Sequence, residues 1–167
     1  MAKIVVLGNS GSGKSSLTSS LAKKLNIEYL HLDKIVYKES WDKPCYEDLK
    51  EEVSKMIDKQ SWIMDGNFLY NCQERFEKCD TIYFLDINRF VCLLSVLKRN
   101  KIYKGKKRES RSDLCDERIT RSYLKWVFFD FYKTSRKIIL KMIKEYNDKN
   151  VVIFKNRKQI NKFLMEE

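Results

Sequence analysis

The chain contains 167 residues, with 34 lysines and arginines against 23 aspartates and glutamates, so its formal net charge is +11. A hydrophobic share of 43%, with five glycines and one proline, excludes a disordered, collagen-like or linker protein. The length predicts a single domain spanning residues 1–167. No uncharged apolar run approaches the ~20 residues of a membrane-spanning helix, and no secretory leader is visible. Five cysteines without a CxxC pair indicate reduced thiols, so we expect a cytoplasmic protein with no membrane partner.

The positive charge is concentrated in one segment. Residues 98–144 hold sixteen basic and five acidic residues, whereas the other 120 residues hold eighteen of each. Seven basic residues and no acidic residue fall within residues 98–108. Such a segment indicates a polyanionic partner, either a nucleic acid or the phosphates of a nucleotide, although a solvated helix face has the same composition.

Strand and helix patterns alternate along the chain. The apolar run at residues 3–7 (KIVVL) predicts a buried strand, and residues 15–25 have helical apolar spacing. Further strands are predicted at residues 28–32, 62–64, 81–85 and 151–154, and further helices at 46–59, 89–99 and 157–165. This order predicts right-handed βαβ crossovers, and hence a five-stranded parallel sheet with helices on both faces.

Residues 114–146 are apolar-periodic almost throughout. A single helix of that length would extend about 50 Å at about 1.5 Å per residue, which is too long for a domain of this size. We therefore expect a break near residues 126–132 (WVFFDFY), whose aromatic side chains indicate core packing.

A phosphate-binding pattern follows the first predicted strand. Residues 8–15, GNSGSGKS, match GxxxxGK[ST], and a predicted helix comes directly after them. The glycines let successive backbone N–H groups point at one anion, and the helix N-terminus adds positive charge. Lys14 can then reach the β- and γ-phosphates of ATP, and the Ser15 hydroxyl can ligate Mg²⁺.

The expected nucleotide-binding residues are Gly8, Ser10, Gly11, Ser12, Gly13, Lys14, Ser15 and Ser16. The predicted fold class is therefore the three-layer α/β fold of P-loop NTPases.

Other motifs narrow the class of P-loop protein. A GTPase would carry DxxG and NKxD, but no glycine here has an aspartate three residues before it, and Asn100-Lys101 is followed by Ile-Tyr. A chain of 167 residues also leaves little room for a transporter or motor ATPase. We expect a kinase that transfers phosphate from ATP to a small-molecule acceptor.

Such a kinase needs an acidic side chain for the metal, cations for the moving phosphoryl group and a lid that excludes water. Asp33, Asp65 and Asp86 follow predicted strands, at the edge where ligands bind to open parallel sheets, although each can equally serve a turn or a helix cap. Residues 101–113, which include the polar run YKGKKR, are the expected lid. The expected cations are arginines 99, 108, 111, 118, 121 and 136.

These motifs resemble those of the adenylate-kinase-like P-loop proteins known as DNA topology modulation proteins. The similarity covers most of the chain. Besides the phosphate-binding loop it includes His31-Leu32-Asp33-Lys34 with Trp41, residues 62–67 (WIMDGN), residues 84–86 (FLD) with Arg89, and the basic stretch 99–108. The resemblance implies a nucleoside monophosphate kinase-like fold.

The resemblance also implies roles for the acidic residues. Asp65 and Gly66 look like the Asp-Gly pair that organises magnesium in nucleoside monophosphate kinases, with Ser15 as the second metal residue. Asp33 is similar in position to an acceptor-site aspartate of small-molecule kinases such as shikimate kinase.

Four arginines resemble functional arginines of the family. Arg75 resembles an acceptor-side arginine, and Arg99, Arg108 and Arg136 resemble lid and phosphate-sensing arginines. The sequence departs from the family pattern at Asn88 and Glu109, where proline is common.

Three functional hypotheses follow. The leading one is an ATP/Mg²⁺-dependent phosphotransferase that acts on a nucleotide or nucleoside, with Asp33 orienting or deprotonating an acceptor hydroxyl. The second is a nucleic-acid-binding, DNA topology-modulating protein whose P-loop is a switch or vestigial, which the basic segment supports, although no known nucleic-acid-binding motif is present. The third is a kinase for a sugar acid, cyclitol or shikimate-type acceptor.

Overall fold

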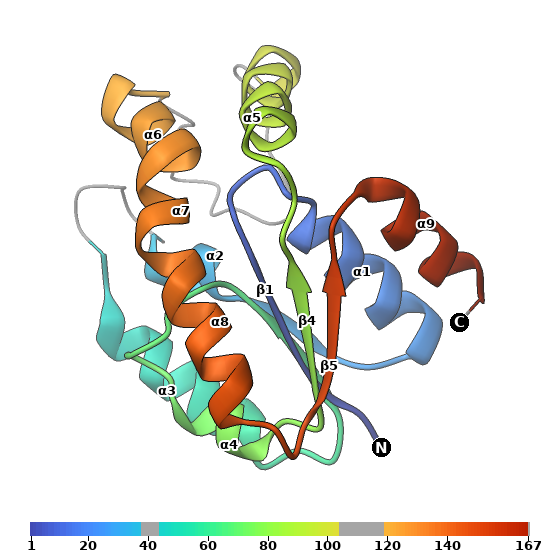
Figure 1. Cartoon of the computed structure of the whole chain (residues 1–167). Helices are drawn as coiled ribbons and strands as arrows, with labels where there is room; N and C mark the ends of the chain where they lie inside the picture. Colours follow the sequence, from blue (N-terminus) through green and yellow to red (C-terminus); the bar gives the residue numbers. More distant parts are fainter. Residues whose placement is uncertain (38–43, 104–118, 167) are drawn as a thin grey trace.

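A single parallel sheet organises the molecule. The computed structural model describes residues 1–37, 44–103 and 119–166 (Figure 1). Among these, five parallel strands pair in the order β2-β3-β1-β4-β5. They are β1 (Lys3–Gly8), β2 (Tyr29–His31), β3 (Trp62–Asp65), β4 (Thr81–Leu85) and β5 (Asn150–Phe154). The predicted five-stranded parallel α/β fold is confirmed. Because β1 is central, the loop that follows it opens where the strand order reverses, which is where ligands bind in open α/β sheets.

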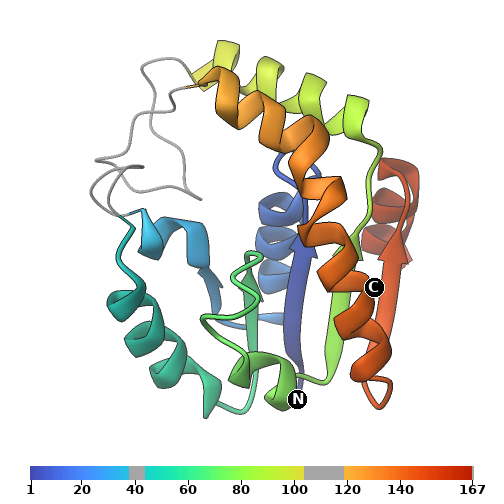
Figure 2. The ribbon, with the colours of Figure 1, turned by 60° about the vertical axis from the view of Figure 1, so that its left-hand side comes forward.

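Helices cover both faces of this sheet, as Figures 1 and 2 show. Helices α1 (Lys14–Leu25) and α9 (Arg157–Glu166) lie on one face, and α3 (Tyr46–Ile57), α4 (Glu74–Lys78) and α8 (Ser135–Glu145) lie on the other. Helix α5 (Arg89–Tyr103) follows β4 at the end of the sheet where the strands finish. In the described part of the chain, no helix is long and apolar enough to cross a membrane.

Side chains of the central strand β1 belong to two hydrophobic cores. Ile4 and Val6 are buried in the cluster that contains side chains of α1 and α9, whereas Val5 and Leu7 are buried in the cluster with α3, α4 and α8. Successive side chains of a strand point to opposite faces, so a continuous apolar run is required for a strand covered on both sides. Burial of each such side chain contributes about 1.5–3 kcal/mol to the free energy of unfolding. This holds β1, and therefore the start of the loop after it, in one position.

The expected second strand is shorter than predicted. Strand β2 ends at His31, and helix α2 (Leu32–Val36) begins directly after it, so Asp33 lies in the first turn of a helix and not at a strand end. Leu32 and Val36 are both fully buried and stand four residues apart, which is a helical spacing. The sequence does not predict this helix, because residues 29–32 (YLHL) alternate as a strand does. The helix depends instead on the burial of Leu32 and Val36 in the tertiary fold.

A break is present, but it lies at Thr134, just beyond the expected stretch 126–132. Helix α6 (Arg121–Lys125) continues into a π-helical turn, η1 (Trp126–Asp130), and then into the short α7 (Phe131–Lys133). Thr134, at φ −117° and ψ −83°, separates α7 from α8. Buried Val127 and Phe131 anchor the turn in the core, and π-turns of this kind are frequent at functional sites.

Candidate functional site

The loop between β1 and α1 packs closely against helix α5. Gly11 has φ +77°, and a Cβ built there would lie 2.3 Å from the Cys92 carbonyl oxygen. Gly13, at φ +105°, forms the N-cap of α1 without a side chain. The sequence therefore folds into a loop whose backbone can approach an anion at the N-terminus of a twelve-residue helix.

Two asparagines brace this loop from behind. Asn67, in the turn after β3, accepts from the Gly8 N–H through Oδ1 (3.1 Å) and donates to the Gly8 carbonyl through Nδ2 (2.9 Å). Asn9 donates through Nδ2 to the Val127 carbonyl in η1 at 2.7 Å, and its Oδ1 accepts from the Ser10 N–H at 2.8 Å. The loop is thereby tied to two segments distant in sequence, and the sequence reasoning assigned no role to either asparagine.

The ammonium of Lys14 lies within the loop. Its side chain is only 9% exposed, and Nζ donates to the carbonyl oxygens of Gly8 (2.9 Å) and Asn9 (3.1 Å). Burial lowers the pKa of Lys14, while the carboxylates of Asp33 and Asp65 oppose that shift. Oxygen atoms of a bound phosphate can replace the two carbonyl contacts without exposing the charge to water.

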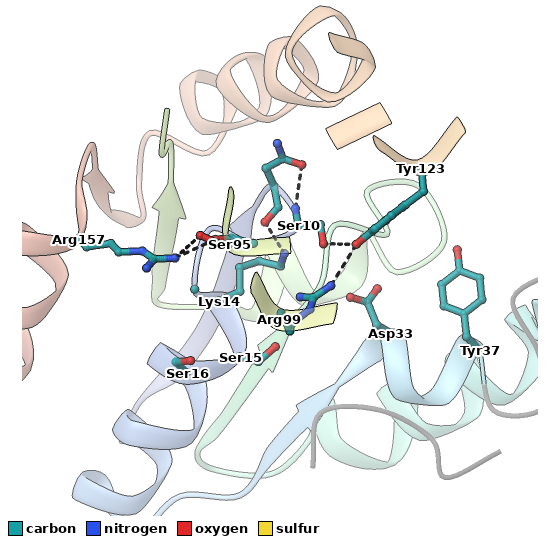
Figure 3. Close-up of a pocket in the computed structure, with 13 residues that line it drawn as sticks. Ser10, Lys14, Ser15, Ser16, Asp33, Tyr37, Ser95, Arg99, Tyr123 and Arg157 are labelled. Carbon is teal, nitrogen blue, oxygen red and sulfur yellow. Dashed lines mark hydrogen bonds between the residues drawn. The ribbon is translucent and has the colours of Figure 1, made fainter. Parts of the chain in front are cut away.

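A cavity of about 210 Å³ opens above this loop (Figure 3). Six of the eight expected nucleotide-binding residues line it, whereas Gly8 and Ser12 are buried and do not. Cationic side chains reach it from three helices, with Lys14 from α1, Arg99 from α5 and Arg157 from α9. This concentration of backbone N–H groups and cations suits a polyphosphate.

Two further contacts connect helices to the loop. Arg157 donates to the Ser95 hydroxyl and, at 3.4 Å, to the Gly11 carbonyl. The Tyr123 hydroxyl of α6 hydrogen-bonds the Ser10 hydroxyl and accepts from Arg99 at 3.2 Å. The sequence reasoning gave neither Arg157 nor Tyr123 a catalytic role, because these contacts join residues 113 or more positions away from the loop.

A second cavity of about 700 Å³ adjoins the first. The two share five residues, which are Ser10, Lys14, Asp33, Tyr37 and Tyr123. The remaining wall comes from the segment after β3 and from α6, η1 and α8. Lys14 and the exposed carboxylate of Asp33 therefore line both cavities.

Asp65 and His31 form a buried pair at the ends of β3 and β2. His31 Nδ1 lies 2.9 Å from Asp65 Oδ1, and the two side chains are 5% and 4% exposed. Asp65 Oδ2 and His31 Nε2 have no hydrogen-bond partner among the described residues. Asp65 lines neither the cavity of Ser15 nor the one beside it, and its orphaned buried oxygen is of the kind that a magnesium ion or its water shell takes as a partner.

Two expected site arginines lie outside both cavities. Arg75 is fully buried, stacks 4.6 Å from the centre of the Phe76 ring, and donates from a terminal nitrogen to the Gly66 carbonyl at 2.8 Å. Burial lowers its pKa to about 10. Arg136 instead donates to both oxygens of Asp86, at 2.7 and 2.8 Å, and Lys155 also contacts that carboxylate at 2.6 Å. Asp86 therefore holds Arg136 at the end of β4, where it lines neither cavity.

Other expectations fall on residues that the structure leaves undescribed. Arg108 lies outside the described residues, as does Trp41. The same is true of residues 104–113 of the expected lid, while residues 101–103 continue helix α5.

The fold is that of P-loop kinases. A shikimate kinase from Bacteroides thetaiotaomicron superposes with a TM-score of 0.57 at 17% identity, over 99% of this chain and 95% of that one. A deoxyadenosine kinase from M. mycoides, with dCMP and dCDP bound, gives a TM-score of 0.52 at 13% identity, over 98% of this chain and 96% of that one. No protein-family model matches the sequence, and neither does any curated protein. Membership of the DNA topology modulation family stays a prediction.

Proposed function

We propose that the protein is an ATP- and Mg²⁺-dependent phosphotransferase that moves the γ-phosphoryl group of ATP to a small acceptor, a nucleotide or nucleoside. One observation carries the proposal, which is that Lys14 and Asp33 line both adjoining cavities. A donor phosphate in the first cavity and an acceptor in the second would meet at these two side chains. P-loop kinases act in this way, by positioning two substrates and stabilising charge between them.

The first cavity is the proposed ATP site. The backbone of residues 8–16 would cradle the β- and γ-phosphates, and Lys14 would exchange its two carbonyl contacts for phosphate oxygens. Arg99 and Arg157 supply two further cations at the cavity wall. Cations in such positions stabilise the negative charge that spreads over the transferring group.

Ser15 and Asp65 are the proposed magnesium residues. The Ser15 hydroxyl would be a direct ligand, and the unpartnered Oδ2 of Asp65 would hold the ion or one of its waters. His31 fixes the other oxygen of Asp65, as partners of metal-site carboxylates commonly do. When bound, the ion supplies charge neutralisation on the β- and γ-oxygens.

Asp33 is the proposed group that receives the acceptor proton. It stands in the first turn of α2, exposed to both cavities, and lies close enough to Lys14 to affect the pKa of that side chain. A hydroxyl oxygen of the acceptor would form the new bond to the γ-phosphorus, the bond between that phosphorus and the ADP oxygen would break, and the hydroxyl proton would pass to Asp33.

Replacement of Lys14 tests the proposal. We expect Lys14→Met to lower acceptor-dependent ADP formation by at least 10³-fold, since the chain loses a charge that contacts the transferring group. The methionine keeps the length and burial of the side chain, so the unfolding midpoint should stay close to that of the wild type. Wild-type turnover by a folded Lys14→Met variant would refute the assignment.

A further inference from the structure

The Tyr123 hydroxyl contacts the phosphate-binding loop and a cation at the same time (Figure 3). It hydrogen-bonds the Ser10 hydroxyl and accepts from Nη2 of Arg99 at 3.2 Å. Tyr123 and Ser10 line both cavities, and Arg99 lines the first. The contact therefore holds the Arg99 guanidinium beside residues that the two cavities share. The reaction proposed above requires the γ-phosphate of ATP to lie beside these shared residues, because the acceptor must reach it from the second cavity.

Tyr123 itself is fixed by hydrogen bonds at two successive turns of the α6–η1 helix. Thr120, the N-cap of α6, accepts from the Tyr123 N–H through Oγ1 at 3.1 Å. Four residues beyond Tyr123, the Val127 carbonyl accepts from Asn9 of the loop at 2.7 Å, and the Val127 side chain is fully buried. Residues four apart on a helix share a face. The same face of this helix therefore contacts the loop twice, which keeps the Tyr123 hydroxyl in place above Ser10.

Arg99 lies on the face of α5 that packs on the loop. The nearest atoms to a Cβ built at Gly11 belong to Cys92 and Val96, and Arg99 follows these two residues by seven and three positions. Such spacings place all three residues on one side of the helix. The backbone thus brings Arg99 to the loop, but the direction of its long side chain is not set by the helix, since arginine has many rotamers.

Two cations that line the first cavity repel each other. Burial is the main cause of the lowered pKa of Lys14, and the positive charge of Arg99 acts in the same direction. This repulsion favours conformations in which the Arg99 side chain turns away from Lys14. The Tyr123 hydroxyl opposes that movement. Because a phenol is a neutral acceptor, this contact directs the guanidinium without adding a negative charge that would compete with phosphate.

We propose that Tyr123 is a positioning residue that holds Arg99 toward the γ-phosphate of bound ATP. The proposal rests on the phosphotransferase function proposed above and adds a residue to its donor site. Tyr123 acts through Arg99, in that its hydroxyl orients the cation and the cation binds oxygens that ATP carries and ADP lacks. The preference of the site for ATP over ADP therefore depends on the Tyr123 hydroxyl.

Equilibrium binding of two nucleotides tests the proposal without any turnover. Dissociation constants are measured calorimetrically, in the presence of Mg²⁺, for ADP and for an ATP analogue whose γ-phosphate cannot be transferred. We expect Tyr123→Phe to weaken binding of the analogue about tenfold and binding of ADP less than twofold, because an oriented charge-assisted contact to the γ-phosphate is lost. A general loosening of the loop would weaken both nucleotides equally. Equal changes, or no change, would overturn the positioning role.

A double-mutant cycle tests whether Tyr123 acts through Arg99. Arg99→Ala alone should reduce the preference for the analogue over ADP at least as much as Tyr123→Phe does. In the Arg99→Ala background, Tyr123→Phe should change this preference less than about twofold, since no guanidinium remains to be held. A second loss of about tenfold in that background would show that the two residues act independently, and it would overturn the proposal.

Tyr146→Phe is the matched control. Tyr146 is half-buried like Tyr123 and stacks on the Phe76 ring, but it lines neither cavity. We expect the control to leave both dissociation constants unchanged. Tyr123→Phe keeps the aromatic ring, and the Ser10 hydroxyl can bond water in the cavity instead, so the unfolding midpoint should stay close to that of the wild type.

The same measurements separate the two proposals. A wild-type protein that forms ADP with an acceptor, together with a Tyr123→Phe variant of unaltered nucleotide preference, would refute the positioning role and leave the phosphotransferase function in place. A wild-type protein that binds neither nucleotide would refute both.

Discussion

Gly11 shows at the scale of one residue how tightly the phosphate-binding loop is held. A methyl group there would lie 2.3 Å from a backbone oxygen of α5, and the residue also has a left-handed conformation. We expect Gly11→Ala to lower the free energy of unfolding by about 3 kcal/mol or more, because neither the loop nor the helix backbone can move cheaply.

Gly13→Ala provides the comparison for that prediction. Gly13 also has a positive φ, but the nearest atom to its added Cβ would be 4.0 Å away. Gly13→Ala should therefore lower the free energy of unfolding only by the backbone strain of about 1–2 kcal/mol. Urea unfolding of the two variants measures the difference, and equal losses would show that the contact with α5 is unimportant.

The sequence predicts some residues of the site and not others. The loop residues were predictable because glycines, Lys14 and Ser15 form one contiguous pattern. Asn67 and Tyr123 contact that loop from positions 59 and 113 residues away, and a single sequence carries no record of such contacts. The resemblance that suggested a site role for Arg75 could not reveal that its side chain packs on Phe76.

Asp86 connects three elements, since it follows β4 and binds Arg136 of α8 and Lys155 at the end of β5. Burial of the carboxyl opposes its ionisation, but the hydrogen bonds from the two cations outweigh that effect and hold the pKa of Asp86 below its ordinary value. A carboxyl with a depressed pKa stabilises the fold above the pKa that it has in the unfolded chain, and that stability is lost as the pH falls through the lower folded value.

Asp86→Asn should therefore have a pH-dependent effect. At pH 7 we expect the variant to be less stable than the wild type by about 2 kcal/mol, because a charge-assisted contact to Arg136 and Lys155 is replaced by a neutral one. Below about pH 4 the difference should shrink as the wild-type carboxyl becomes protonated. Urea titrations at several pH values measure this, and a difference that is constant from pH 3 to pH 7 would disprove the electrostatic explanation.

Helices and strands were predictable where the apolar pattern spans the whole element. The strands at residues 81–85 and 151–154 and the helices α1 and α9 agree with the apolar periodicity. The five-residue helices α2 and α4 are too short to establish a helical period, and both depend on buried contacts with the core. A break close to residues 126–132 was predictable from length alone, but its position at Thr134 was not, and the π-helical form of residues 126–130 reflects packing of Val127 and Phe131.

The whole molecule places two cavities on one edge of a parallel sheet, on either side of Lys14 and Asp33. Alternating strands and helices predict the sheet and the edge, because right-handed crossovers leave few other arrangements. They do not predict which segments wall the second cavity, since η1 and the segment after β3 meet there only through the tertiary fold.

The destination of the γ-phosphoryl group tests this account most directly. ATP labelled in its γ-phosphate should be incubated with the protein, Mg²⁺ and a mixture of nucleosides and nucleoside monophosphates, and the labelled products separated. The account predicts that the label appears on one of these acceptors, in an amount equal to the ADP formed, and that Lys14→Met gives neither product. Label found only in inorganic phosphate, at a rate independent of the acceptors, would contradict a phosphotransferase.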